Sequence, residues 1–211
     1  MPLLDAALIV FAKAPVPGAA KTRLIPALGA AGAAALHARL VRHCLRVARP
    51  LFEEITLWCA PDAAHPFFAE CAAEFGVPLR AQDGVDLGAR MAHALHTTLA
   101  QMPRALLIGT DCPVLNAPTF AEAVDALHAN DGVFVPVEDG GYALVGARAT
   151  ALPLALWFAG VAWSTASVMQ TTRERLTDQG QTWHECAALW DVDEPADLAR
   201  LQAVLPSLLA P

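Results

Sequence analysis

A loop near the N-terminus carries both lysines of the chain. Lys13 and Lys21 stand close together, Arg23 follows, and every other basic residue of the sequence is an arginine. A compact ammonium and a planar guanidinium hold oxyanions differently, so this confinement of lysine favours a binding role over a merely solvated cationic loop. With Gly18 in the same loop, the three cations favour phosphate binding.

The loop matches neither of two common phosphate-binding patterns. The pattern G-x-x-x-x-G-K-[ST] needs a glycine directly before its lysine, whereas Ala20 precedes Lys21. The pattern G-x-G-x-x-G needs three glycines, whereas Gly18 stands alone in the loop. A P-loop NTPase and a dinucleotide-binding Rossmann protein are therefore disfavoured.

Acidic residues form a second candidate group. Asp111 follows a short apolar run, and Asp191 and Asp193 lie just before Pro195, where a closing helix is expected. Each motif alone would be an ordinary Asp turn or a helix cap. Facing a cationic loop, however, such a pair would supply the one or two carboxylates that Mg²⁺ combines with substrate phosphates.

The apolar pattern predicts the elements that must position these groups. Residues 6–12 form a continuous apolar run typical of a strand buried on both faces, and runs at 55–59, 77–80 and 105–108 indicate further strands. Apolar spacing typical of helices separates them, and the alternation predicts an α/β fold with a largely parallel sheet.

A glycine turn interrupts this alternation. Runs at 132–136 and 142–145 flank residues 138–141 (Glu-Asp-Gly-Gly), which indicates a local antiparallel pair and hence a mixed sheet. Ligands of open α/β sheets bind beyond the carboxyl ends of the strands. We therefore expect the segments 13–24, 109–113 and 138–142 to meet at one edge.

Composition narrows the class of protein. Of 211 residues, 55% are hydrophobic and 17% charged, which excludes intrinsic disorder, and the net charge of -7 disfavours a nucleic-acid partner. Five cysteines without a C-x-x-C pattern suggest neither disulfides nor a zinc knuckle, and His93 and His96 lack ligand partners in sequence. With no signal peptide and no membrane-spanning stretch identified, we expect a cytoplasmic protein without a membrane partner.

Six motifs together resemble a known group. They are residues 11–18 (Phe-Ala-Lys-Ala-Pro-Val-Pro-Gly), 21–24 (Lys-Thr-Arg-Leu), 87–91 (Leu-Gly-Ala-Arg-Met), 109–113 (Gly-Thr-Asp-Cys-Pro), 138–142 (Glu-Asp-Gly-Gly-Tyr) and 191–198 (Asp-Val-Asp-Glu-Pro-Ala-Asp-Leu). This set resembles an uncharacterised, glycosyltransferase-like bacterial family of the nucleotide-diphospho-sugar transferase (glycosyltransferase A) fold. It is also similar to the phospholactate guanylyltransferases. The resemblance implies one three-layer α/β/α domain over residues 1–211, with a mixed, mostly parallel central sheet.

The resemblance also implies roles for individual residues. Those expected to bind the nucleotide are Lys13, Gly18, Lys21, Arg23, Gly88 and Arg90. Those expected to act in catalysis are Lys21, Asp111 and Asp139, and those expected to bind the acceptor are Glu138 and Gly140. Asp111 and Asp193 would hold Mg²⁺ (or Mn²⁺), with Asp191 as the alternative second ligand.

The implied activity is a Mg²⁺-dependent transfer involving a nucleotide or nucleotide sugar and a small-molecule acceptor. Either a nucleotidyl group passes from an NTP to a phosphorylated acceptor, or a glycosyl group passes from a nucleotide sugar. The glycine-rich first loop of sugar nucleotidyltransferases, L-x-A-G-x-G-x-R, is absent, which leaves the donor open. A non-catalytic nucleotide sensor that uses the same loop is the alternative.

Residues 152–163 are too apolar for a solvent loop and are interrupted by Pro153 and Gly160. They could pack on the domain's own core. Alternatively, Trp157, Phe158 and Trp163 could line the acceptor side of the site or a homodimer interface. The resemblance favours a place near the ligand site, because this segment follows the Gly-Gly turn along the chain. We therefore expect Trp157 to contribute to acceptor binding or dimerisation.

Overall fold

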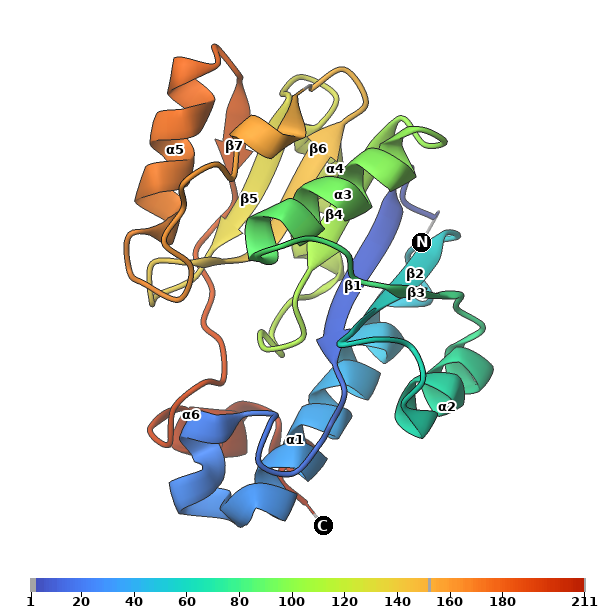
Figure 1. The fold of residues 1–211 in the computed structure, drawn as a ribbon, viewed down its shortest axis with the longest axis vertical. Helices are drawn as coiled ribbons and strands as arrows, with labels where there is room; N and C mark the ends of the chain where they lie inside the picture. Colours follow the sequence, from blue (N-terminus) through green and yellow to red (C-terminus); the bar gives the residue numbers. More distant parts are fainter. Residues whose placement is uncertain (1–2, 152, 211) are drawn as a thin grey trace.

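A seven-stranded sheet organises the computed structural model, which describes residues 3–151 and 153–210 (Figure 1). Within this part of the chain the strand order is β3-β2-β1-β4-β6-β5-β7. The strands are β1 (Ala7–Lys13), β2 (Ile55–Ala60), β3 (Leu79–Ala81), β4 (Arg104–Ile108), β5 (Gly132–Pro136), β6 (Tyr142–Arg148) and β7 (Trp183–Glu185). Since β6 alone runs antiparallel to its neighbours, the prediction of a mixed, mostly parallel sheet is confirmed.

Helices cover both faces of the sheet. They are α1 (Ile25–Ala48), α2 (Pro66–Phe75), α3 (Leu87–Leu99), α4 (Ala117–Ala126), α5 (Val168–Asp178) and α6 (Asp197–Val204). Side chains of β1 alternate between the two layers, as the two-residue period of a strand requires. Leu8 and Val10 pack with α1, α2 and α4, whereas Ile9 and Phe11 pack with α3 and α5. The three-layer α/β/α prediction is confirmed.

Helix α1 follows the cationic loop and a short 3₁₀ turn, η1 (Thr22–Leu24). By length and composition the stretch Thr22–Ala48 could cross a membrane, with a mean hydropathy of 1.5. Gly29, at φ 69°, breaks this stretch, and Leu36, Leu40 and Leu45 beyond the break are fully buried in the protein. Core packing thus accounts for the apolar residues beyond the break.

The segment after β6 is part of the core. Leu152 lies outside the described residues; Leu154–Leu156 form the 3₁₀ turn η2, and Trp157 follows it. Trp157 is 0% exposed and stacks against Gly132 and Phe134 of β5. The prediction that Trp157 serves acceptor binding or dimerisation is therefore wrong, because its ring fills the layer between η2 and the sheet.

The end of the chain returns to α1. After β7, the last strand along the sheet, the chain passes the carboxyl ends of the strands and reaches α6, which lies beside the first turns of α1 (Figure 1). Trp190, Val192, Leu201 and the 3₁₀ turn η3 (Pro206–Leu208) form an apolar cluster there with α1. This crossing brings residues 189–193 to the edge where the N-terminal loop lies.

Candidate active site

Three of the predicted segments meet at one edge of the sheet. Val10 of β1 pairs with Ile108 of β4, and Ile108 pairs with Leu144 of β6. Since β6 is antiparallel, its first residues lie at the same edge as the last residues of β1 and β4. Residues 13–24, 109–113 and 138–142 are therefore neighbours, as the sequence predicted.

Lys21 lies at the centre of this edge. Its side chain is only 3% exposed, and its Nζ donates to the Val192 carbonyl oxygen at 2.5 Å. The same Nζ lies 2.8 Å from Asp111 Oδ1 and 3.7 Å from Asp193 Oδ1. The ammonium thus links two carboxylates that are far apart in sequence, and Lys21 adopts a left-handed backbone (φ 49°) to do so.

The backbone itself joins the two acidic motifs. The Val192 N–H donates to the Asp111 carbonyl oxygen at 2.8 Å, so the segment 191–193 lies alongside the turn after β4. Asp191 is half-buried there. Burial, and then the nearby charges of Asp139 and Asp111, raise the pKa of Asp191 to about 6.

Four carboxylates crowd together at this edge. Asp111, Asp139, Asp191 and Asp193 converge, and Lys21 and Arg23 are the cations that pair with them in the described residues. Oxygen donors in excess of their counter-charges suit Mg²⁺, which prefers carboxylates and retains bound water or phosphate oxygens. The donor set therefore fits the predicted metal.

The remaining cations of the N-terminal loop are exposed. Arg23 is 54% exposed and its Nη1 lies 2.5 Å from Asp193 Oδ2. Lys13 and Arg90 line a pocket of about 260 Å³ together with the loop after β1. Arg90 is fixed there by its Nε, which donates to the Gly84 carbonyl oxygen at 3.1 Å. Lys13 and Arg23 are therefore accessible from solvent, unlike the buried Lys21, and Arg90 is partly exposed beside Lys13.

Gly18 turns the same loop with φ 84°, a conformation that favours glycine. A Cβ at this position would meet no atom within 4 Å, so packing alone would allow a larger residue here. Its positive φ is what the loop needs.

A mainly apolar pocket of about 200 Å³ lies on the other side of Asp139. Leu87 and Met91 of α3 form one wall, and Tyr142 and Trp163 form another. Asp139 lines both this pocket and the acidic one that contains Asp191 and Asp193. It is thus the carboxylate shared by the two halves of the site, and its Oδ1 is held by the Gly141 N–H at 2.8 Å.

Gly140 and Gly88 allow close packing around this pocket. A Cβ on Gly140 (φ 90°) would lie 2.2 Å from the Ala166 carbonyl oxygen, and the Met169 N–H donates to the Gly140 carbonyl at 2.9 Å. A Cβ on buried Gly88 would lie 2.8 Å from side-chain atoms of Phe158 and Trp163. Both glycines therefore shape the pocket walls.

Glu138 is held away from the apolar pocket. Arg200 of α6 binds its carboxylate with both terminal nitrogens, at 2.8 and 3.1 Å, and the same guanidinium lies over Trp190 at 4.6 Å. Glu138 lines the acidic pocket rather than the apolar one. The structure places it with Asp191 and Asp193.

Two histidines of α1 support the site and were not identified from the sequence. His37 Nε2 lies 3.0 Å from the Lys13 carbonyl oxygen, and His43 Nε2 lies 2.9 Å from the Pro113 carbonyl oxygen. Burial lowers the pKa of His37, so the neutral ring is favoured. In the sequence, the available signal for these two residues was a histidine lying among the apolar residues of a predicted helix.

Solved structures share this architecture. A protein from Desulfovibrio desulfuricans G20, provisionally described as a nucleotide-diphospho-sugar transferase, matches with a TM-score of 0.85 and 28% identity over 96% of this chain and 90% of that one. CMP:2-keto-3-deoxy-manno-octonic acid synthetase, complexed with CTP, matches at 0.58 and 13% over 96% and 99%. The inositol-1-phosphate CTP transferase of T. maritima matches at 0.59 and 12% over 98% of each chain.

The chain thus has the nucleotide-diphospho-sugar transferase fold, and these neighbours agree with its prediction as a transferase. It belongs to the family described as "Uncharacterized protein conserved in bacteria (DUF2064)", whose model matches residues 43–165. The matched region contains the 109–113 and 138–142 motifs and excludes the lysine loop and residues 191–193. A search of curated proteins found no match.

Proposed function

We propose that the protein is a Mg²⁺-dependent nucleotidyltransferase that joins a nucleotidyl group from an NTP to a small phosphorylated acceptor. The observation that carries this proposal is Lys21, whose buried ammonium joins Asp111 to Asp193 beside a loop with two further cations. Neighbours of the same fold include a CTP complex and a CTP transferase, which supports nucleotidyl over glycosyl transfer.

The triphosphate is the ligand that suits the cationic side of the site. Lys13 and Arg90 line the pocket beside the loop after β1, and Arg23 lines the acidic pocket, so an NTP that spans both would bring negative charge to all three. Charge-assisted bonds to phosphate are about twice as strong as neutral ones. We assign these three residues, with the Gly18 turn, to phosphate binding.

Asp111 and Asp193 would hold Mg²⁺, with Asp191 beside them. When bound, the ion would offset phosphate charge and help to orient the triphosphate. The acidic pocket that contains Asp191 and Asp193 has a volume of about 250 Å³, which leaves room for phosphate oxygens. Lys21 would remain next to the same carboxylates on their buried side.

In the proposed reaction an acceptor phosphate oxygen attacks the α-phosphorus of the NTP. The bond from that phosphorus to the β-phosphate oxygen breaks, and pyrophosphate leaves. Positive charge at Lys13, Lys21 and Arg23 stabilises the charge that develops on the leaving group. No covalent intermediate with the protein is required.

The acceptor would occupy the apolar pocket beyond Asp139. This pocket is lined by Leu87, Met91, Tyr142 and Trp163, so it favours an acceptor with an apolar or flat portion. Asp139 would lie between acceptor and nucleotide. In glycosyl transfer the same carboxylate would serve as base for an acceptor hydroxyl.

Thermal-shift screening of NTPs and nucleotide sugars, each with and without Mg²⁺, tests the proposal. A ligand at 100 times its dissociation constant stabilises a fold by about 2.7 kcal/mol, which is easily measured. We expect an NTP to raise the melting temperature only with Mg²⁺. When the protein is incubated with an NTP and a panel of acceptors, we expect pyrophosphate to be released. Release of a nucleoside diphosphate from a nucleotide sugar would instead establish glycosyl transfer, and binding without turnover would favour the sensor.

A further inference from the structure

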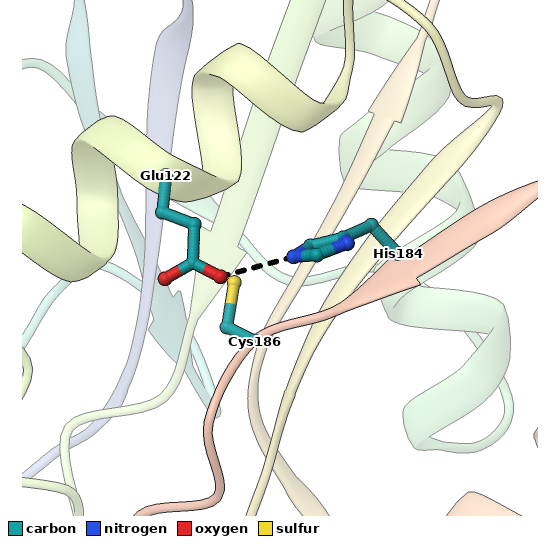
Figure 2. A group of neighbouring side chains, drawn as sticks. All are labelled: Glu122, His184 and Cys186. Carbon is teal, nitrogen blue, oxygen red and sulfur yellow. Dashed lines mark hydrogen bonds and ion pairs between the residues drawn. The ribbon is translucent and has the colours of Figure 1, made fainter.

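Three side chains outside the active site form a compact group of metal-ligand atoms. Glu122 lies on α4, His184 on β7, and Cys186 just after β7 (Figure 2). One ligand atom from each lies within 4.8 Å of the other two. From this group we propose a zinc site, formed by the Cys186 thiolate, His184 Nε2 and the Glu122 carboxylate. The proposal does not rest on the proposed function.

The geometry needs only a small adjustment to hold the ion. Ligands at about 2.0 to 2.3 Å from a tetrahedral Zn²⁺ are about 3.3 to 3.8 Å apart. His184 Nε2 and Glu122 Oε1 are 3.0 Å apart in a hydrogen bond, so they would part by a few tenths of an ångström to take the ion between them. Figure 2 shows both side chains pointing toward the Cys186 sulfur. Since the sulfur lies within 4.8 Å of both atoms, it would move toward them by at most about 1 Å.

The chemistry of the donors selects zinc over magnesium. A thiolate with an imidazole is a soft to borderline set that favours Zn²⁺, whereas Mg²⁺ prefers oxygen donors alone. Burial, together with the adjacent Glu122 carboxylate, raises the pKa of the Cys186 thiol to about 12, so the thiol keeps its proton while no metal is bound. Zinc binding would release that proton to solvent as the sulfur–zinc bond forms.

The surroundings leave one coordination position open. Cys186 is buried, but the Glu122 and His184 side chains are 50% and 41% exposed, so water can complete a tetrahedron from the solvent side. An exposed Glu–His pair by itself contributes little to stability. The addition of a buried sulfur at the same point is what distinguishes this group from a surface ion pair.

The site would fasten an edge of the sheet. β7 is short, pairs only with β5 in the described residues, and is followed by the segment that carries Asp191 and Asp193. The Cys186 N–H donates to the Phe134 carbonyl oxygen at 2.9 Å, which fixes one end of the site on β5. A zinc ion would tie this edge to α4.

Cobalt substitution tests the site in the full-length chain. After treatment with a chelator, Co²⁺ should produce a near-ultraviolet thiolate-to-metal band and the visible bands of a four-coordinate ion, and Zn²⁺ should remove both. Mg²⁺ in excess should leave them unchanged, because the active-site carboxylates provide no sulfur. Cys186→Ala should abolish the thiolate band, while Cys71→Ala, which removes another buried thiol, should retain it.

Two further variants keep the test decisive if Cys186→Ala fails to fold. Glu122→Gln and His184→Ala change exposed side chains, and each should weaken Co²⁺ binding by about tenfold or more. His96→Ala, an exposed histidine on α3, should bind Co²⁺ as the unaltered chain does. A missing thiolate band in the unaltered chain, a band that survives Cys186→Ala, or unchanged binding in Glu122→Gln would overturn the proposal.

Discussion

The ammonium of Lys21 is buried against the carboxylate of Asp111, with 2.8 Å between Nζ and Oδ1, although 90 residues (111 minus 21) separate them in the chain. Asp111 is 47% exposed on its other side. One carboxylate therefore faces both a buried lysine and solvent. This arrangement allows Asp111 to accept a second cation without abandoning the first.

Lys21→Arg should bind the nucleotide nearly as weakly as Lys21→Ala. The guanidinium is larger and planar, and the Lys21 side chain is 3% exposed and already held by the Val192 carbonyl oxygen. We expect a loss of at most a few kcal/mol in nucleotide affinity for either variant, measured by calorimetry. Arg23→Lys, at an exposed position, is the matched control and should lose much less. Full rescue by Lys21→Arg would show that charge alone matters.

Asp111→Asn should abolish Mg²⁺-dependent turnover, and Asp193→Asn should do the same, because each removes a carboxylate from the proposed metal site. Asp111→Asn also leaves the buried Lys21 with a weaker partner, which should cost about 1 to 3 kcal/mol of stability. Turnover as a function of Mg²⁺ and thermal unfolding separate the two effects. Asp125→Asn, on the exposed side of α4, should change neither. Unaltered metal dependence in both site variants would refute the assignment.

Asp191→Asn should raise the melting temperature at pH 7.5. The folded-state pKa is about 6 against an ordinary 3.8, so this group's favourable contribution to stability is present below pH 3.8 and is lost as pH rises through 6. A pKa difference of about two units corresponds to about 3 kcal/mol in the free energy of unfolding. Solvent screening reduces this to about 1 kcal/mol, which changes the melting temperature by about 2 to 4 °C. Melting curves from pH 3.5 to 8 should show the two proteins converging at the acid end. A constant difference across that range would contradict this origin.

Gly140→Ala should disrupt the pocket beyond Asp139. Its new Cβ would overlap the Ala166 backbone, which leads into α5, so the 164–167 segment must move. Gly180→Ala is a matched control, because Gly180 also has a positive φ (64°) but open space around it. Both variants should pay about 1 kcal/mol of backbone strain. Only Gly140→Ala should, in addition, lose ligand response in thermal-shift and turnover assays.

Trp157→Ala and Trp163→Ala should separate stability from binding. Trp157 is fully buried, so its removal should cost about 3 to 5 kcal/mol in denaturant unfolding. Trp163 is half-buried in the pocket wall, so its loss should weaken acceptor binding more than it lowers stability. Equal stability losses with unchanged acceptor affinity would remove Trp163 from the acceptor site.

Much of the fold followed from local pattern. The apolar run of β1 and the Gly-Gly turn between β5 and β6 indicated their strands directly. Strand β7 was not predicted, because it has only three residues and none of them is aliphatic.

Local sequence pattern could not predict which residues distant in the chain lie together in the structure. The sequence placed Lys21 and Asp193 in one site by analogy, but the backbone bond from Val192 to Asp111 that aligns them depends on the tertiary fold. Glu122 lies 62 residues from His184, a spacing typical of no short metal motif. For Trp157, hydrophobicity predicted burial but could not tell the core from a pocket.

The contact between Lys21 and Val192 spans 171 positions of a 211-residue chain. Closing a loop of that length carries a large entropic cost before any contact repays it, so such contacts form late. During synthesis the cationic loop and β1 emerge long before Asp191 and Asp193 do. A ribosome-bound chain would therefore have its lysines in place without two of their carboxylate partners, and the site would become complete only after residues 191–193 had been made.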